Sequence, residues 1–285
     1  MDPFLFNGVN KFIEGATEGP IKTFNKTWEL VFGGFHLYTD KIQFKRERSF
    51  EIFKKQFKDE ISFVPEENLQ EPQISLLGPA LEASKFYIEE ESLSKMFAKL
   101  IASSMDNRKD YVTHHSFVEI IKQFSPNDAI LLKHLSYNPV HPAAKFKAVI
   151  NKDSDAINLS DSLIKDSPLD IHSTELSINN LVRLGLLKEN FGLLSLTKPG
   201  IYDEFYKSTF YTYFSNKIKS EKESPYLNGV KQLLKENLNI EQVCSRINVE
   251  YTNLLSVLQP WVLDFDKGSV NLTAYGKSFI RACID

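Results

Sequence analysis

Histidine is the residue type in this sequence best suited to acid–base or metal chemistry. Five of the six histidines lie in the middle of the chain, at His114, His115, His134, His141 and His172. A zinc site needs ligands spaced to share one face, as in HExxH, and no pair here has that spacing. His114 and His115 instead precede an apolar helical pattern, which favours a turn or a helix cap. We therefore predict no catalytic residue, no metal ligand and no cofactor.

Other enzyme motifs are also missing from the sequence. Gly33-Gly34 is not followed by the Lys-Ser/Thr of a phosphate-binding loop, and no G-x-S-x-G nucleophile motif occurs. Negative charge at a helix start explains Glu89 to Glu91 more simply than cation binding does. Cys244 lies in an apolar periodic segment, and no local charge marks it as a thiolate. The sequence therefore predicts a protein that is not an enzyme.

One helix and the strand after it offer side chains suited to DNA. Asn179, Asn180 and Arg183 lie on a predicted helix from Thr174, and Lys188 follows in a predicted wing. Winged-helix proteins read base edges with Asn and Arg and bind phosphate with Lys. Basic residues are nevertheless sparse here, so protein contacts or internal packing are favoured for this helix over nucleic-acid binding.

Residues 42–61 predict a basic amphipathic helix, because Phe50, Phe53, Phe57 and Ile61 recur every three or four positions. Its cations are Lys45, Arg46, Arg48, Lys54, Lys55 and Lys58. Contact with an anionic membrane or an acidic partner is one interpretation. The favoured one is a stripe of Phe packed on the rest of the protein, because acidic residues on the polar face partly neutralise the cations.

A run of helices is predicted over residues 78–135. Residues 92–105 carry Leu93, Phe97 and Leu100 at helical spacing, and residues 117–124 repeat the pattern. Ser125-Pro126-Asn127-Asp128 then predicts a helix start, with an N-cap, a Pro at the first helical position and an acid at the third.

Three motifs in this segment resemble the Abi-alpha (abortive infection) family of bacterial proteins, which is associated with defence against phage. They are GP-x-LEA at residues 78–83, the helix ending in MFAKLIASSMD, and H-x-SFVEIIKQ-x-SP-x-DA from His114 onward. The resemblance covers roughly residues 20–210 and implies a role in phage defence. The family usually has His-Pro-Ser-Phe at the third motif, whereas His115 replaces the proline here. His114 is the position that aligns with this motif, and we expect it in a turn.

The second half contains an internal repeat, L-T-x-x-G, at residues 196–200 and 272–276, and each copy is predicted to lead into an apolar helix. Before the first copy, a helix from Thr174 is expected to end at Gly185, and a hairpin to follow with its turn at Glu189-Asn190. This order of elements indicates a winged-helix-like domain whose first helix starts at Pro126. Thr197 is expected to cap the helix after the hairpin.

Residues 240–258 predict a second module of this kind, with a turn at Asn248-Val249 between two helices and a wing at 262–272. Residues 136–171 read as a loop-rich insertion with one strand at 146–150. The polar run of residues 215–224 reads as a linker.

We therefore predict a mostly α fold with small β-hairpins, built from an N-terminal helical region and two winged-helix-like modules. The expected boundaries are 1–72 for the amphipathic N-terminal region and 73–214 for the helical pair with the first module and its insertion. Residues 215–285 would contain the linker and the C-terminal module.

Composition limits the function without deciding it. The 285 residues are 42% apolar and 25% charged, which is typical of a globular protein, and a net charge of −3 gives no general attraction for nucleic acid. Cys244 and Cys283 lack ligand spacing and indicate reduced thiols in a cytoplasmic protein. The N-terminus lacks the features of a signal peptide, and residues 28–38 are too short to span a membrane.

The leading hypothesis is a cytoplasmic, non-enzymatic phage-defence protein of the abortive infection type that binds another macromolecule. A protein is the expected partner, either a phage or host component or a second copy of the chain. Two alternatives stay open: a winged-helix DNA-binding regulator, and an effector that binds the membrane surface through residues 42–61.

Overall fold

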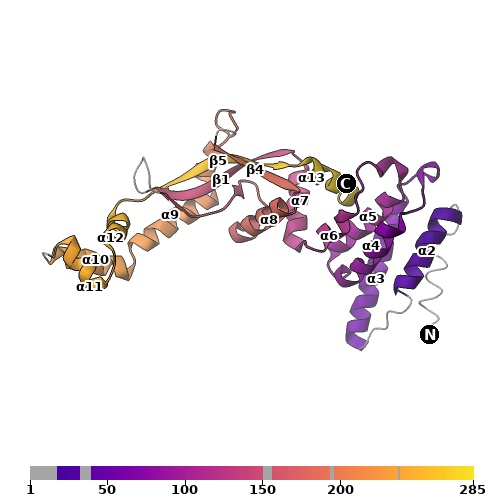
Figure 1. The fold of residues 1–285 in the computed structure, drawn as a ribbon, viewed down its shortest axis with the longest axis horizontal. Coiled ribbons are helices and arrows are strands. Elements are labelled where there is room, and N and C mark those ends of the chain that lie inside the picture. The colour runs from indigo at the N-terminus through magenta and orange to yellow at the C-terminus, as the bar shows by residue number, and fades with distance from the viewer. Residues whose placement is uncertain (1–17, 33–39, 150–155, 193–195, 237) are drawn as a thin grey trace. The chain divides into compact units, whose positions relative to one another are not determined.

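The computed structural model describes residues 18–32, 40–149, 156–192, 196–236 and 238–285 (Figure 1). Side chains are described there except at 18–19, 40–47 and 256–257. The chain divides into two compact units. Unit 1 comprises Met1–Pro139, Asn180–Leu187 and Leu272–Asp285, and unit 2 comprises Val140–Asn179 and Lys188–Asn271. The predictions for the N-terminus and for Gly33-Gly34 lie outside the described residues.

Among the described residues, unit 1 is built from helices, and the fold is mostly α with a small antiparallel sheet in unit 2. The helices of unit 1 are α2 (Glu18–Phe32), α3 (Asp40–Ile61), α4 (Ile74–Tyr87), α5 (Glu91–Ser104), α6 (Ser116–Ile121), α7 (Pro126–Ser136) and α13 (Ala274–Cys283). Helix α8 (Ile171–Arg183) runs across the division between the units. The predicted helices at residues 92–105, 117–124 and 126 onward are confirmed.

Helix α5 is the centre of unit 1 and packs against α3, α4 and α13. Phe97, Leu100 and Ile101 on this helix are fully buried. This apolar stripe at helical spacing makes α5 stable only when neighbours cover it. Helix α13, which comes from the far end of the sequence, supplies part of that cover.

Two Phe residues of α3, Phe53 and Phe57, face inward, as the favoured interpretation of this helix predicted. Phe53 and Phe57 are fully buried. The Phe57 ring stacks on Phe24 of α2 at 4.3 Å between centroids, and Trp28 of α2 stacks on Phe53 at 5.9 Å. Aromatic pairs at these separations add to the free energy of burial.

Capping fixes where two helices of unit 1 begin. The Ser125 side chain accepts a hydrogen bond from the Asp128 N–H, which confirms the predicted helix start of α7. The Asp128 carboxylate also accepts one from the Ser125 N–H, so the two residues form a capping box. Thr273 caps α13 by accepting from the Gly276 N–H at 2.9 Å. Gly276 lies directly against the Leu186 carbonyl, so a larger residue would not fit there.

The sheet of unit 2 has the strand order β2-β1-β5-β4, and β3 also pairs with β1. The strands are β1 (Val140–Val149), β2 (Ala156–Asn158), β3 (Leu163–Ile164), β4 (Leu187–Phe191) and β5 (Val262–Leu272). Strands β1 and β5 are antiparallel, with a register that runs from Val140 opposite Asn271 to Val149 opposite Val262.

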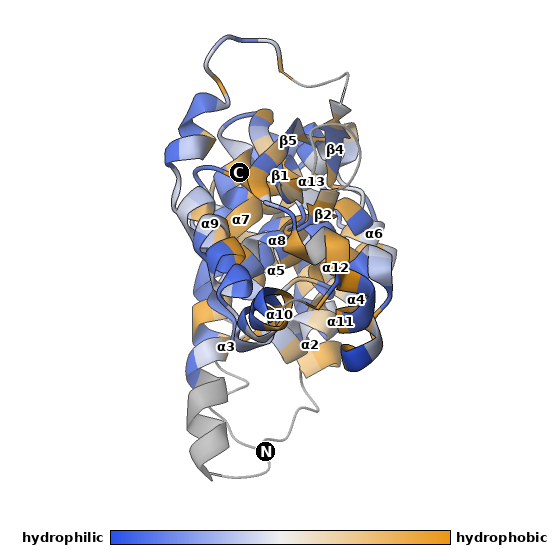
Figure 2. Cartoon of the chain, turned by 90° about the vertical axis from the view of Figure 1, so that its left-hand side faces the viewer, coloured by the Kyte–Doolittle hydropathy of each residue, from blue (hydrophilic) through white to orange (hydrophobic). Residues whose placement is uncertain are grey.

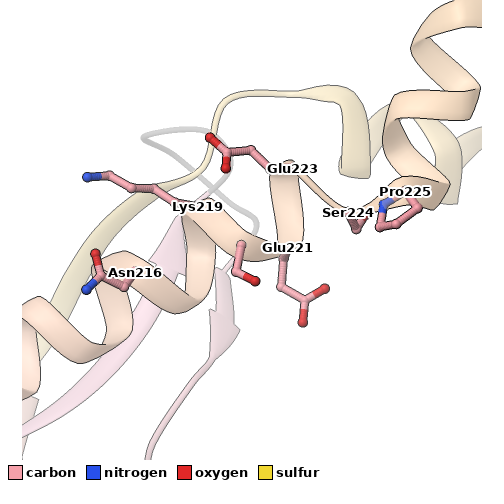
Figure 3. A pocket seen from close by; sticks show the side chains of 7 residues that line it. Asn216, Lys219, Glu221, Glu223, Ser224 and Pro225 are labelled. Atoms are coloured by element: carbon pink, nitrogen blue, oxygen red, sulfur yellow. The ribbon is translucent and has the colours of Figure 1, made fainter.

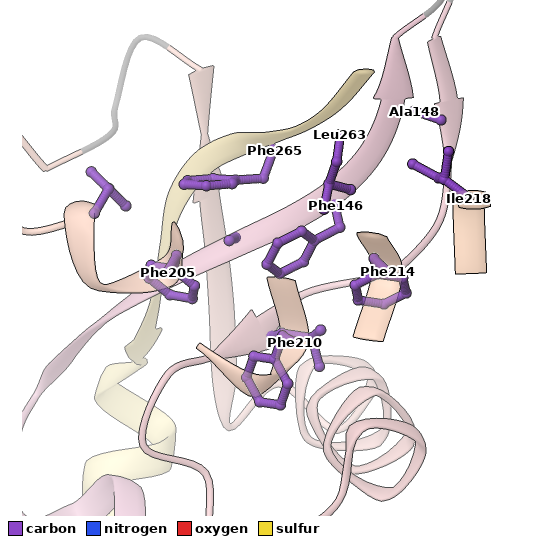
Figure 4. Packing of buried hydrophobic residues seen from close by; sticks show 11 residues of the cluster. Phe146, Ala148, Phe205, Phe210, Phe214, Ile218, Leu263 and Phe265 are labelled. Carbon is purple, nitrogen blue, oxygen red and sulfur yellow. The ribbon is translucent and has the colours of Figure 1, made fainter. Parts of the chain in front are cut away.

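The core of unit 2 lies between one face of this sheet and the helix α9 (Thr209–Lys222) (Figure 4). Ala144, Phe146 and Ala148 alternate along β1 and point to this core. Phe146 meets Phe214 of α9 at 4.9 Å and Phe265 of β5 at 5.4 Å.

Two predictions for this region are wrong in detail. The strand predicted at 146–150 begins already at Val140, because its pairing with β5 extends back to Val140 opposite Asn271. The predicted linker at 215–224 is largely the C-terminal part of α9. Phe210, Phe214 and Ile218 recur every four positions along α9 and are buried, so this otherwise polar helix has one apolar stripe.

The expected wings also differ from the structure. Glu189 and Asn190 lie inside β4 and form no turn, and residues 262–272 form one continuous strand. Thr197 precedes a turn and the 3₁₀ helix η4 (Asp203–Lys207). Only the second L-T-x-x-G copy therefore begins an α-helix, α13.

After α9 the chain forms α10 (Pro225–Lys235), α11 (Ile240–Ile247) and α12 (Tyr251–Leu258). Helices α11 and α12 confirm the predicted pair of helices joined at Asn248-Val249. Asn248 has a left-handed backbone, with φ of 53°, which Asn tolerates better than most residues. The three helices close on a small core that includes Val230, Val243 and Leu254. Hydrophilic and hydrophobic residues both occur on each of these helices (Figure 2).

Candidate functional site

The strongest candidate site joins the family motif at His114 to the start of α13. His114 Nδ1 lies 2.6 Å from Ser116 Oγ and accepts a hydrogen bond from the Ser116 N–H at 3.2 Å. Ser116 Oγ also bonds the hydroxyl of Tyr275. His114, Ser116 and Tyr275, which we call the His–Ser–Tyr cluster, thus form one hydrogen-bonded chain within unit 1.

Aromatic packing holds the cluster in place. The His114 and Tyr275 rings are nearly perpendicular, with centroids 6.0 Å apart, and Phe117 lies 5.3 Å from Tyr275. Phe117 is itself fully buried and packs edge-on against Phe279 of α13 at 5.1 Å. His114 remains exposed while Ser116 and Tyr275 are half-buried, so the cluster is open to solvent on one side.

His114 lies just before α6 and accepts a hydrogen bond from the N–H of the first residue of that helix. Ser116 belongs to the family motif, but Tyr275 was not predicted as its partner. The repeat L-T-x-x-G contains Tyr275, yet no local pattern could pair residues that lie 159 positions apart.

Three of the four side chains predicted to contact DNA form hydrogen bonds within their own units. Asn180 donates to the Asp128 carboxylate at 2.9 Å, and Arg183 donates to the Asn180 side-chain oxygen at 2.7 Å, both in unit 1. Asn179 donates to the Asp161 carboxylate at 2.8 Å in unit 2. Lys188 is exposed on β4 of unit 2. The structure therefore gives these four residues no common site within either unit.

The cations predicted to form one surface on α3 fall into three groups. Arg48, Lys55 and Lys58 are exposed. Lys54 is buried. Its ammonium lies 2.8 Å from the Glu51 carboxylate and 4.5 Å from the centre of the Phe50 ring. The side chains of Lys45 and Arg46 lie outside the described residues.

Two surface hollows of unit 2 hold charged side chains. One lies at the junction of α9 and α10, about 550 Å³ in size, and its Lys219, Glu221 and Glu223 point in different directions (Figure 3). The other, of about 340 Å³, lies beside β1 and β3. There Lys165 pairs with both Glu204 and Asp166, so its charge is compensated within the hollow.

Burial changes the acid–base behaviour of two other groups in unit 1. Desolvation raises the pKa of the buried Cys283 thiol well above its ordinary value, which keeps the thiol protonated. Desolvation, together with the charge of Lys99, lowers the pKa of Lys109. The Lys109 ammonium donates to the Arg281 carbonyl at 3.0 Å and so caps the last turn of α13.

Metal ligands do not gather in the part of the chain that the structure describes, where no three His, Cys, Asp or Glu side chains are placed to hold an ion. In the same described ranges, no helix is long and apolar enough to cross a membrane.

A comparison with protein families gives one match. The family described as abortive infection alpha matches residues 45–283. This range includes the His–Ser–Tyr cluster in full and extends well beyond the N-terminal motifs that carried the resemblance. No curated protein and no solved structure matches the chain.

Proposed function

The chain belongs to the abortive infection alpha family, and from that premise we propose that it is a phage-defence protein that binds another macromolecule. The family match over residues 45–283 is the observation that carries the proposal. We propose that the protein acts in the bacterial cytoplasm, without catalytic turnover, and that its partner is a protein.

Exposed aromatic side chains of unit 1 support a binding role. Phe63, Phe86, Tyr111 and Tyr137 are between 73% and 78% exposed. Aromatic residues supply much of the free energy of protein–protein binding. These four positions are the surface residues that we expect the partner to cover.

The alternatives receive less support from the side chains. DNA binding through Asn180 and Arg183 would require their internal hydrogen bonds to break. Membrane binding through α3 would need an apolar face turned to lipid, and Phe53 and Phe57 are buried inside unit 1. We propose that the helix–turn–helix of α11 and α12 also serves protein contacts.

The test is a phage challenge of bacteria that express the chain with its neighbouring genes, at a low and a high ratio of phage to cells. We expect protection at the low ratio, and at the high ratio death of infected cells with a reduced phage yield. A culture that shows no protection against any phage of a broad panel would contradict the proposed defence role.

Single substitutions then test the binding role. Phe63, Phe86, Tyr111 and Tyr137 are each replaced by Ser, and Tyr226 of α10, which is 53% exposed, serves as the matched control in unit 2. At least one of the four variants should lose protection while keeping the thermal stability of the parent. Protection that survives all four changes would rule out these residues as partner contacts.

A further inference from the structure

The hydrogen bond from the Ser116 N–H to His114 assigns a direction to the other bonds of the His–Ser–Tyr cluster. That direction gives Ser116 a chemical character that the proposed binding role does not use. His114 Nδ1 accepts the Ser116 N–H, so this nitrogen carries no proton, and a neutral imidazole with Nδ1 as acceptor has its proton on Nε2. The short contact from Ser116 Oγ to Nδ1 must then be a bond that the serine hydroxyl donates.

Tyr275 must in turn be the donor to Ser116. A hydroxyl has one proton, and that of Ser116 is directed at His114, so its oxygen can only accept from the Tyr275 hydroxyl. The chain therefore runs from Tyr275 to Ser116 to His114. A basic nitrogen takes the serine proton, and a phenol hydrogen bond stabilises the oxygen that remains.

From this geometry we propose that Ser116 is a nucleophilic hydroxyl and a site of covalent acylation by an activated ester or thioester. The arrangement meets two conditions for an activated serine: a base within hydrogen-bond distance of the hydroxyl, and neighbours that hold the base. The buried Phe117 packs beside the His114 ring at 6.0 Å between centroids. Access is provided by the exposed His114 side of the cluster.

The proposed step balances without any redox partner. An oxygen lone pair of Ser116 attacks the carbonyl carbon and forms the new O–C bond, while the hydroxyl proton moves to His114 Nδ1. The bond from carbon to the leaving alkoxide or thiolate then breaks with its electron pair. That leaving group takes the proton from His114, and the products are an acylated Ser116 and a free alcohol or thiol.

The test uses an alkyl fluorophosphonate, which forms a stable ester with activated serines and releases fluoride. The full chain is incubated with the probe, and the labelled peptide is identified by mass spectrometry. We expect one label per chain on Ser116, and none there in Ser116→Ala. Ser125 is the internal control, because it also lies at the start of a helix but its hydroxyl bonds the Asp128 carboxylate at 2.8 Å.

Two further variants separate activation from folding. His114→Asn keeps an acceptor for the Ser116 N–H but supplies no base, so labelling should slow by roughly 100-fold while the thermal stability is kept. Tyr275→Phe should slow labelling by a smaller factor. Three results would overturn the proposal. They are no labelling, labelling spread over many serines as in the urea-unfolded chain, and labelling of Ser116 that is unchanged in His114→Asn. Phage protection is a separate readout, so either proposal can fail alone.

Discussion

At the scale of single residues, Gly276 is the position where the backbone leaves least space. A methyl group there would overlap the Leu186 carbonyl, and this backbone atom cannot move aside like a side chain. We expect Gly276→Ala to lower the free energy of unfolding by about 1–3 kcal/mol, measured by urea denaturation. Gly229→Ala in α10 is the control, since nothing lies within 4 Å of its added methyl. It should stabilise the helix by about 0.5–1 kcal/mol, and equal losses in both variants would contradict this explanation.

Asp106 should make stability depend on pH. Its carboxylate accepts from the Arg108 guanidinium at 2.8 and 2.7 Å, which lowers its pKa below the ordinary value of 3.8. A carboxylate with a lowered pKa in the folded state contributes stability above the unfolded pKa, and this contribution is lost as the pH falls through the folded one.

The corresponding variant is Asp106→Asn, compared with the parent by urea denaturation near neutral pH and at about pH 3. The difference in unfolding free energy between parent and variant should be larger near neutral pH than in acid. A difference that is the same at both pH values would show that the Arg108 contact does not control this titration.

At the scale of elements, the capping box should decide the stability of α7. Ser125→Ala removes the acceptor for the Asp128 N–H at the helix start. The expected cost is about 1 kcal/mol of unfolding free energy, again measured with urea. Ser220→Ala on the exposed side of α9 replaces the same side chain away from a cap and should change stability by less than about 0.5 kcal/mol.

Helix α9 offers a second test, because its sequence is polar enough to resemble a linker. Phe214→Ala removes a buried ring that stacks on Phe146. Truncating a buried Phe costs about 3–5 kcal/mol, whereas Tyr213→Ala changes a residue that is 51% exposed and should cost much less. Circular dichroism during thermal unfolding distinguishes the two, and similar melting curves would mean that residues 215–224 behave as a linker.

At the scale of the whole molecule, unit 1 should depend on the end of the chain. Helix α13 supplies Phe279, which meets Phe117 at 5.1 Å and Phe124 at 5.5 Å. A chain truncated after Leu272 should therefore show faster amide hydrogen exchange in α5, because the apolar stripe of α5 loses part of its cover. Peptides of α10 and α11 serve as the internal control, and unchanged exchange in α5 would contradict this role of α13.

Much of the helical structure could be predicted because helices are local. Periodic apolar residues in α5 and α6, and the capping residues Ser125 and Asp128, lie within a few positions of one another. The same holds for the turn at Asn248 between α11 and α12. Such signals need no information about the rest of the chain, so the elements that they predict are present where expected.

The sheet and the sites could not be predicted in this way. Strand β5 pairs with β1, which lies more than 100 positions earlier in the chain. The sequence of a strand is the same whether it pairs with a distant strand or folds into the hairpin of a wing, so the pattern of residues alone does not distinguish the two. Residues 215–224 likewise read as a linker from their polar sequence. In the structure most of them belong to α9, and this helix is held by Phe214, which packs on Phe146 of the sheet.

The sequence by itself determined the family, the mostly α fold class and the helix starts, because motifs and caps depend on neighbouring residues. Only the tertiary structure decided which partners the polar side chains have and which of them are buried. It joined Tyr275 to Ser116 and engaged Asn180 with Asp128, and it buried Lys54. Each of these depends on which distant groups the fold brings within hydrogen-bond distance, and a linear sequence does not contain those distances.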